Sequence, residues 1–178
     1  DCDDSDSETN PAATDIPGDG VDQDCDGADA EGCDTASCTP DATIASTGSS
    51  VFTAAGSPAC SQGDGTCSWN DTEDYLLSWT PAGSGCATID TVGSATDTVL
   101  SVWDGCPLTD GAEVECDDDI GGGVYQSSVE ADVTAATEYF ILVEAYSASS
   151  PLTDVIVNLE LAEGVTCGAT ANDADADG

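Results

Sequence analysis

The stretch 127-SSVEADVTAATEYFILVEAYS-147 decides the fold class of this chain. In its first part, Val129, Ala131 and Val133 alternate with polar residues, which is the period of a β-strand with one buried face. The segment 138-EYFILVEAY-146 is apolar on both faces, as expected for a central strand. A short turn segment separates the two patterns, so the stretch predicts antiparallel β structure.

Similar strand patterns occur before and after this stretch. They are separated by clusters of Gly, Ser, Asp and Pro, and no segment has the periodicity of a convincing amphipathic helix. The residues placed on shared faces are Tyr75, Leu77 and Trp79; Leu100 and Val102, with Val99 and Trp103 on the opposite face; and Val155, Val157, Leu159 and Leu161. About eight strands in roughly 130 residues predict an all-β fold, an antiparallel β-sandwich or jelly roll.

Composition divides the chain into three regions. We expect a small acidic, loop-rich module in residues 1–32, the β-sandwich in residues 33–167 and a second acidic segment in residues 168–178. The middle region carries almost all the aromatic and β-branched residues. A hydrophobic content of 39% favours a folded chain over the disorder that its charge alone would indicate.

The charge is entirely of one sign. The chain has 37 Asp and Glu residues and no Lys, Arg or His, so its formal net charge is −37. Such a chain repels itself, and positive charge must come from divalent cations, high salt or a basic partner. Nucleic acid is excluded as a partner because no side chain can neutralise a phosphate.

The ten cysteines predict disulfides and an oxidising, extracellular compartment. Zinc binding is not expected because the chain has no histidine and no C-x-x-C pair. No stretch is long and apolar enough to span a membrane, and no signal peptide lies within these residues, so any such peptide has been removed or lies upstream.

The middle region resembles the bacterial pre-peptidase C-terminal domain over residues 40–163. The resemblance rests on a series of segments in the order of that family: 74-DYLLSWTPAGSGCATIDT-91, 97-DTVLSVWDGC-106, 114-VECDDDIGGG-123, 127-SSVEADVTAATEYFILVEAYS-147 and 155-VIVNLEL-161. The resemblance implies a β-sandwich that is appended to secreted enzymes and surface proteins. It also implies calcium or polymer binding, as in some members, and no catalysis by the domain itself.

The start of the chain resembles the MopE-type metal-binding repeat and, more loosely, thrombospondin type 3 calcium repeats. The matching elements are 1-DCDDSD-6, 10-NPAATDI-16 and 22-DQDCDG-27. The third cysteine of the family, after the isoleucine, is absent here. Within the repeat only Cys2 and Cys25 remain, and we expect them to pair.

Spacing alone predicts two further disulfides. Cys60 and Cys67 bracket a short loop, and Cys106 and Cys116 bracket the segment between two predicted strands. Four cysteines, namely Cys33, Cys38, Cys86 and Cys167, have no assigned partner. A bridge from Cys38 to Cys167 would tie the ends of the sandwich, but other pairings stay open.

The two ends of the chain together carry a calcium-loop pattern. Joined head to tail, 173-DADADG-178 and 1-DCDDSD-6 give twelve residues with glycine at position six. An EF-hand loop has carboxylates at positions one, three, five and twelve and a backbone carbonyl at seven. The expected ligands are Asp173, Asp175, Asp177, the carbonyl of Asp1, Asp3 and Asp6. The alternative is a solvated acidic tail.

A second partial loop lies in residues 22–27. Its alternating carboxylates are Asp22, Asp24 and Asp26, with Asp4 and Asp19 among the residues that would complete the sphere. The turn 116-CDDDIGGG-123 is a third acidic cluster, either a calcium or recognition loop or a polar hairpin turn. All these ligands are oxygens, which select Ca²⁺, whereas copper finds no His, no Met and no reduced cysteine.

An enzyme is not expected, because without His or Lys the common nucleophilic triads cannot form. The predicted function is therefore an extracellular calcium-binding structural protein. The chain would be a subunit or tandem repeat of a bacterial surface fibre or adhesive array, with copies of itself as partners. The alternative is a non-catalytic anchoring region of a larger secreted hydrolase, with surface polysaccharide as a partner.

Overall fold

The computed structural model describes residues 9–11, 25, 38–55, 65–67, 72, 74–107, 109, 111–147 and 152–168. Within these residues there are nine strands and no helix. The strands are β1 (Ala42–Ile44), β2 (Gly48–Ala54), β3 (Asp74–Trp79), β4 (Gly85–Asp90), β5 (Thr98–Asp104), β6 (Ala112–Asp117), β7 (Ser128–Val133), β8 (Tyr139–Ala145) and β9 (Val155–Glu163).

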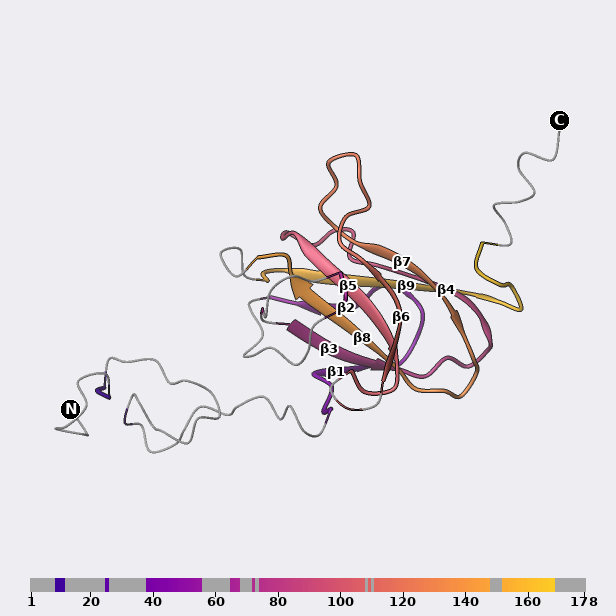
Figure 1. Ribbon diagram of the computed structural model, residues 1–178, viewed down its shortest axis with the longest axis horizontal. Coiled ribbons are helices and arrows are strands. Elements are labelled where there is room, and N and C mark those ends of the chain that lie inside the picture. The colour runs from indigo at the N-terminus through magenta and orange to yellow at the C-terminus, as the bar shows by residue number, and fades with distance from the viewer. Residues whose placement is uncertain are drawn as a thin grey trace.

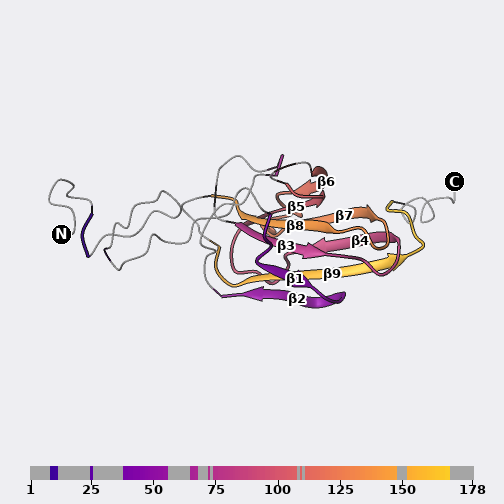
Figure 2. The same cartoon turned by 90° about the horizontal axis from the view of Figure 1, so that it is seen from below.

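The strands form two facing sheets, which confirms the predicted all-β sandwich (Figures 1 and 2). One sheet has five strands in the order β1-β3-β8-β5-β6, and the other has four in the order β2-β9-β4-β7. All neighbouring pairs are antiparallel except β1 with β3, which is parallel. Strand β8, which is buried at every position, lies at the centre of the larger sheet, as its sequence predicts.

The main core lies between the sheets and contains the predicted inward faces. From β8 it receives Tyr139, Ile141 and Val143. The other predicted core positions are also buried there: Leu77, Trp79, Leu100, Val102, Val129, Ala131, Val133, Val155, Val157 and Leu159, with Tyr75 and Leu161 partly buried against them. Strict alternation therefore predicted these faces correctly.

A second apolar layer lies on the outer face of the five-stranded sheet. It consists of Leu76, Phe140 and Leu142, with Cys38 and Trp103 packed against them. A sheet buried on both faces explains why β8 is apolar at every position but one.

Part of the connection from β2 to β3 crosses this outer face. The Gly65 amide donates to Glu144 Oε2 at 3.0 Å, and the Thr66 amide donates to Glu113 Oε2 at 2.6 Å. The neighbouring residue Cys67 forms a disulfide with Cys116 of β6. We call residues 65–67 the outer strap.

The disulfides differ from the predicted pairs. Cys67 pairs with Cys116 and Cys106 pairs with Cys38, so the predicted Cys60–Cys67 and Cys106–Cys116 bridges are wrong. The physical reason is the register of the β5–β6 hairpin. Its pairs place Cys116 opposite Ser101 and Ala112 opposite Asp104, whereas Cys106 follows β5 at the turn. Four strand residues span about 13 Å, too far for a bridge.

The third bridge joins Cys86 of β4 to Cys167, which follows β9. The suggested Cys38–Cys167 tie is therefore wrong, although both cysteines anchor ends of the sandwich. Cys25 is disulfide-bonded, while Cys2 and Cys60 lie outside the described residues. The Cys2–Cys25 pair stays a prediction.

Candidate metal centre

The structure does not test the calcium loops predicted at the ends of the chain. The residues concerned lie outside the described part: Asp1, Asp3, Asp4, Asp6, Asp19, Asp22, Asp24, Asp26, Asp173, Asp175 and Asp177. They stay predictions. What the structure does describe is the third acidic cluster and a partner that the sequence did not reveal.

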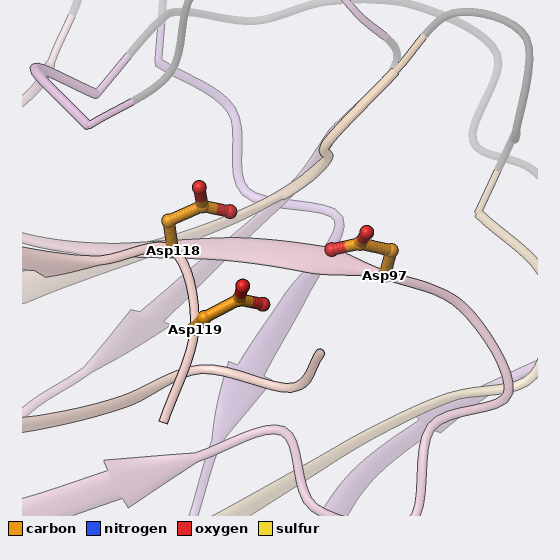
Figure 3. Close-up of side chains that lie close together, drawn as sticks. All are labelled: Asp97, Asp118 and Asp119. Atoms are coloured by element: carbon orange, nitrogen blue, oxygen red, sulfur yellow. The ribbon is translucent and has the colours of Figure 1, made fainter. Parts of the chain in front are cut away.

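Three carboxylates converge at one end of the β5–β6 hairpin. Asp97 directly precedes β5, and Asp118 and Asp119 directly follow β6. Because β5 and β6 are antiparallel, with Leu100 opposite Asp117, the start of one strand and the end of the other meet. One oxygen from each carboxylate lies within 4.8 Å of the other two, and the three groups point toward one another (Figure 3).

A buried network of hydroxyl groups supports this end of the hairpin. The hydroxyls of Thr91 and Thr98 lie 2.6 Å apart, and that of Ser127 lies 3.2 Å from Thr98 Oγ1. The Ser127 hydroxyl also approaches the backbone carbonyl of Asp118, at 2.9 Å. These buried contacts hold the backbone at Thr98 and Asp118, next to the carboxylates of the cluster.

Backbone hydrogen bonds hold the other sides of the cluster. The Thr98 amide donates to the Tyr125 carbonyl at 3.1 Å, and the Tyr146 amide donates to the Asp97 carbonyl at 3.2 Å. The loop between β6 and β7 projects from the sandwich beyond these contacts (Figure 1). Its tip contains Gly121, Gly122 and Gly123, all with positive φ, a conformation that glycine adopts without steric cost.

The electrostatics of the cluster favour a bound cation. Within the residues that the structure describes, Asp97 Oδ1, Asp118 Oδ1 and the neighbouring Thr96 Oγ1 are buried and make no hydrogen bond. Burial raises the pKa of the Asp97 carboxyl, and the nearby Asp119 charge raises it further. Burial likewise raises the pKa of Asp118, with further increases from Asp119, Asp97 and Asp117. An ion among these oxygens would reverse both penalties.

The chemistry of the donor set is that of a hard divalent cation. Carboxylate and hydroxyl oxygens suit Ca²⁺, which takes six to eight oxygen ligands. Asp119 is exposed, so the cluster is open to solvent on one side. Asp117 has another role, because its Oδ2 accepts a hydrogen bond from the Ser128 amide at 2.8 Å.

Sequence reasoning identified Asp118 and Asp119 as an acidic turn but missed Asp97. The sequence held part of this information, because Asp97 begins one predicted strand and the run 116-CDDD-119 ends the next. Only the antiparallel pairing of those two strands brings the residues together.

Comparison with known proteins gives matches to both parts of the chain. The MopE-type family model described as "Putative metal-binding motif" matches residues 1–31, which confirms the resemblance of that segment. Among solved structures, the chain is similar to the pre-peptidase C-terminal domain of collagenase from Bacillus anthracis. The identity is 11%, the TM-score is 0.41, and the match covers 67% of this chain and 97% of that one.

A second similar structure is the CBM35 domain of Abf62 from Cellvibrio japonicus. Its identity is 12%, its TM-score is 0.32, and the match covers 67% of this chain and 90% of that one. A search of curated proteins found no match. In the described part of the chain, no helix is long and apolar enough to cross a membrane. The disulfides are typical of secreted or extracellular proteins.

Proposed function

We propose that this chain is an extracellular, calcium-binding structural module without catalytic activity. The observation that carries the proposal is the Asp97, Asp118 and Asp119 cluster, with its buried oxygens, in a chain that has no cationic side chain. Three carboxylates this close repel one another, and no Lys, Arg or His can relieve that repulsion. A divalent ion from the medium can do so.

Calcium suits these donors better than copper does. The chain has no His and no Met, and three disulfides join six of its cysteines in pairs. Copper would therefore find only oxygen ligands at the cluster, which suit Ca²⁺, Mg²⁺ or Mn²⁺ instead. The acidic segments at residues 1–6, 22–27 and 173–178 have the same donor chemistry.

The finer form of the proposal is a head-to-tail assembly. The segment 173–178 of one unit and the segment 1–6 of the next would together form a twelve-residue calcium loop. Such a loop cannot close without a cation, so calcium would stiffen the junction between sandwiches. The assembly would be a bacterial surface fibre or adhesive array, linked covalently or between subunits.

A second candidate function is anchoring to a partner or polymer. It is favoured by apolar side chains on the projecting β6–β7 loop beside the cluster. Ile120 is 46% exposed, Val124 39% and Tyr125 58%, and Tyr146 nearby is 46% exposed. Exposed aromatic and apolar groups around a cation site suit a binding surface of an accessory domain in a larger secreted enzyme.

Electron microscopy of the native material before and after EDTA tests the structural proposal. Fibres that break up on chelation and re-form with calcium are expected. Dispersed particles that EDTA leaves unchanged would rule out the assembly and favour the anchoring function. Magnesium at the same ionic strength is the control, because a non-specific screening effect would also restore the fibres with magnesium.

A further inference from the structure

Two carboxyl groups lie fully buried beneath the outer strap. Asp74 of β3 and Glu144 of β8 are both 0% exposed. They are directly opposite each other in the antiparallel β3–β8 pair, so their side chains emerge on the same face. Alternation along β8 puts Glu144 on the face of Phe140 and Leu142, which is the outer apolar layer.

No side chain in this protein can neutralise them. The sequence contains no Lys, Arg or His, so an ion pair with a basic side chain is impossible at this position. Directly opposite residues in an antiparallel pair have Cβ atoms about 5 Å apart. Two carboxylates this close in an apolar layer cannot both ionise without a large penalty, because burial and like charge both favour the neutral acid.

The groups around the pair are mostly neutral in the described part of the chain. On this face β5 contributes Val99, opposite Glu144, and Ser101, neither of which titrates. The strap contributes the Gly65 amide and the disulfide-bonded Cys67. Two described carboxylates contact the strap or this layer: Glu113 of β6 receives hydrogen bonds from Thr66, and Asp41 accepts one from the Leu76 amide of β3 at 2.8 Å.

The strap is fitted closely to Glu144. A Cβ on Gly65 would lie 3.2 Å from Glu144 Oε2 and 2.9 Å from the Ser101 side chain. The backbone amide of Gly65 can approach the carboxyl only because glycine has no side chain. A change in the charge of Glu144 is therefore transmitted to the strap directly.

We propose that Asp74 and Glu144 share one proton and form a pH-sensitive latch that holds the outer strap against the sheet. With the proton in place the pair carries a single negative charge, which the Gly65 amide helps to stabilise. Loss of the proton leaves two buried charges, and the strap lifts so that water reaches them. The strap then moves within the limit set by the Cys67–Cys116 bridge. This latch does not depend on the calcium proposal.

The direction in which stability changes with pH follows from the number of protons that the pair binds in the folded and unfolded states. At neutral pH the folded pair holds one proton, whereas the unfolded chain has released both. Stability therefore falls as pH rises, and the unfolding equilibrium constant increases about tenfold per pH unit while the proton is held. Replacing either carboxyl group of the pair with an amide should remove this dependence of the unfolding equilibrium constant on pH.

Urea unfolding of the full chain in EDTA, at fixed ionic strength between about pH 5 and pH 8, tests the latch. We compare the wild type with Glu144→Gln and Asp74→Asn, and with Glu130→Gln on the exposed face of β7 as the matched control. In both latch variants the unfolding equilibrium constant should rise less steeply with pH than in the wild type, by up to about tenfold less per pH unit. In the control it should rise as steeply as in the wild type. Equal slopes in all four proteins would overturn the proposal.

Hydrogen exchange of the wild type gives a test that needs no variant to fold. The protection factor of the Gly65 amide should fall as pH rises, and it should stay below that of the fully buried Ile89 amide in β4, whose exchange reports unfolding of the whole sandwich. A Gly65 protection factor independent of pH would overturn the latch. So would a pair held by a metal ion, in which case calcium would restore both protection and stability at high pH.

Discussion

At the scale of single residues, the acidic cluster is the feature with the clearest consequence. Asp118 is half-buried and its Oδ1 has no hydrogen-bond partner among the described residues, so solvent screens its charge only in part. Its carboxylate repels Asp97 and Asp119 in the metal-free protein and would coordinate the ion in the calcium-bound protein. The same side chain is therefore unfavourable without calcium and favourable with it.

We expect Asp118→Asn to weaken calcium binding at this cluster by about tenfold or more, because the site loses a charged ligand. In the absence of calcium the same substitution should stabilise the fold. Isothermal titration calorimetry with calcium measures the first effect as the loss of one class of site, and urea unfolding in EDTA measures the second. The control is Asp104→Asn, at the exposed far end of β5. Unchanged calcium affinity and stoichiometry in Asp118→Asn would contradict the site.

The pKa values of Asp97 and Asp118 predict how calcium stabilisation depends on pH. Both are raised above the usual 3.8, first by burial and then by neighbouring carboxylates. In the metal-free protein their contribution to stability is complete below 3.8 and is lost as pH rises through the raised values. Calcium needs ionised ligands, so its affinity falls as pH falls through the same values.

We therefore expect the calcium-induced increase in unfolding midpoint to grow with pH across that window. Thermal unfolding with and without calcium at a series of pH values measures it, with sodium chloride of equal ionic strength as the control. If the calcium-induced increase in the unfolding midpoint does not change with pH, calcium stabilises the protein at a site other than this cluster.

At the scale of elements, β8 is the strand that organises the molecule. Ile141 and Leu142 are both fully buried, but they point to opposite faces of the sheet. We expect Ile141→Ala and Leu142→Ala each to cost about 2–5 kcal/mol, because each leaves a cavity in a packed layer. Urea unfolding measures both. A cost below about 1 kcal/mol for Leu142→Ala alone would show that the outer layer is not a true core.

The Cys67–Cys116 bridge holds the outer strap on that layer. Replacing both cysteines with serine should cost about 2–4 kcal/mol, as expected for a bridge that closes a long loop. Its sequence separation is 49 residues, and that of Cys86–Cys167 is 81, so the two bridges should stabilise by similar amounts. Urea unfolding of the two double variants makes the comparison. A much smaller effect at Cys67–Cys116 would mean that the strap contributes little packing.

The edges of the sheets bear on how units could assemble. Edge strand β1 has three residues, and edge strand β2 has an irregular register with Ser50 at a positive φ. Short and bulged edges resist strand addition. Strand addition at β1 or β2 is thus disfavoured, whereas the other two edge strands, β6 and β7, have six residues each.

At the scale of the whole molecule, the charge of −37 dominates. Monovalent salt should stabilise the fold by screening this charge. If calcium binds specifically to the folded state, as we propose, it should stabilise the fold much more at the same ionic strength. Calorimetric melting in calcium chloride and sodium chloride of matched ionic strength measures the difference. Equal melting temperatures would contradict specific binding.

The sequence by itself determined the all-β class and the inward faces of the strands, and it predicts a need for external cations. These follow from the two-residue period of strands and from composition, both of which are local. It also located the acidic turn that contains Asp118 and Asp119. The calcium loops predicted in residues 1–6, 22–27 and 173–178 stay predictions.

Only the tertiary structure decided which distant residues meet. The pairing of β5 with β6 brings Asp97 to Asp118, and the pairing of β3 with β8 puts Asp74 opposite Glu144. Register also decided the disulfides, since Cys106 and Cys116 lie at different ends of one hairpin. The reason is that strand pairing depends on the free energy of the whole sandwich, whereas residue spacing along the chain reports only local geometry.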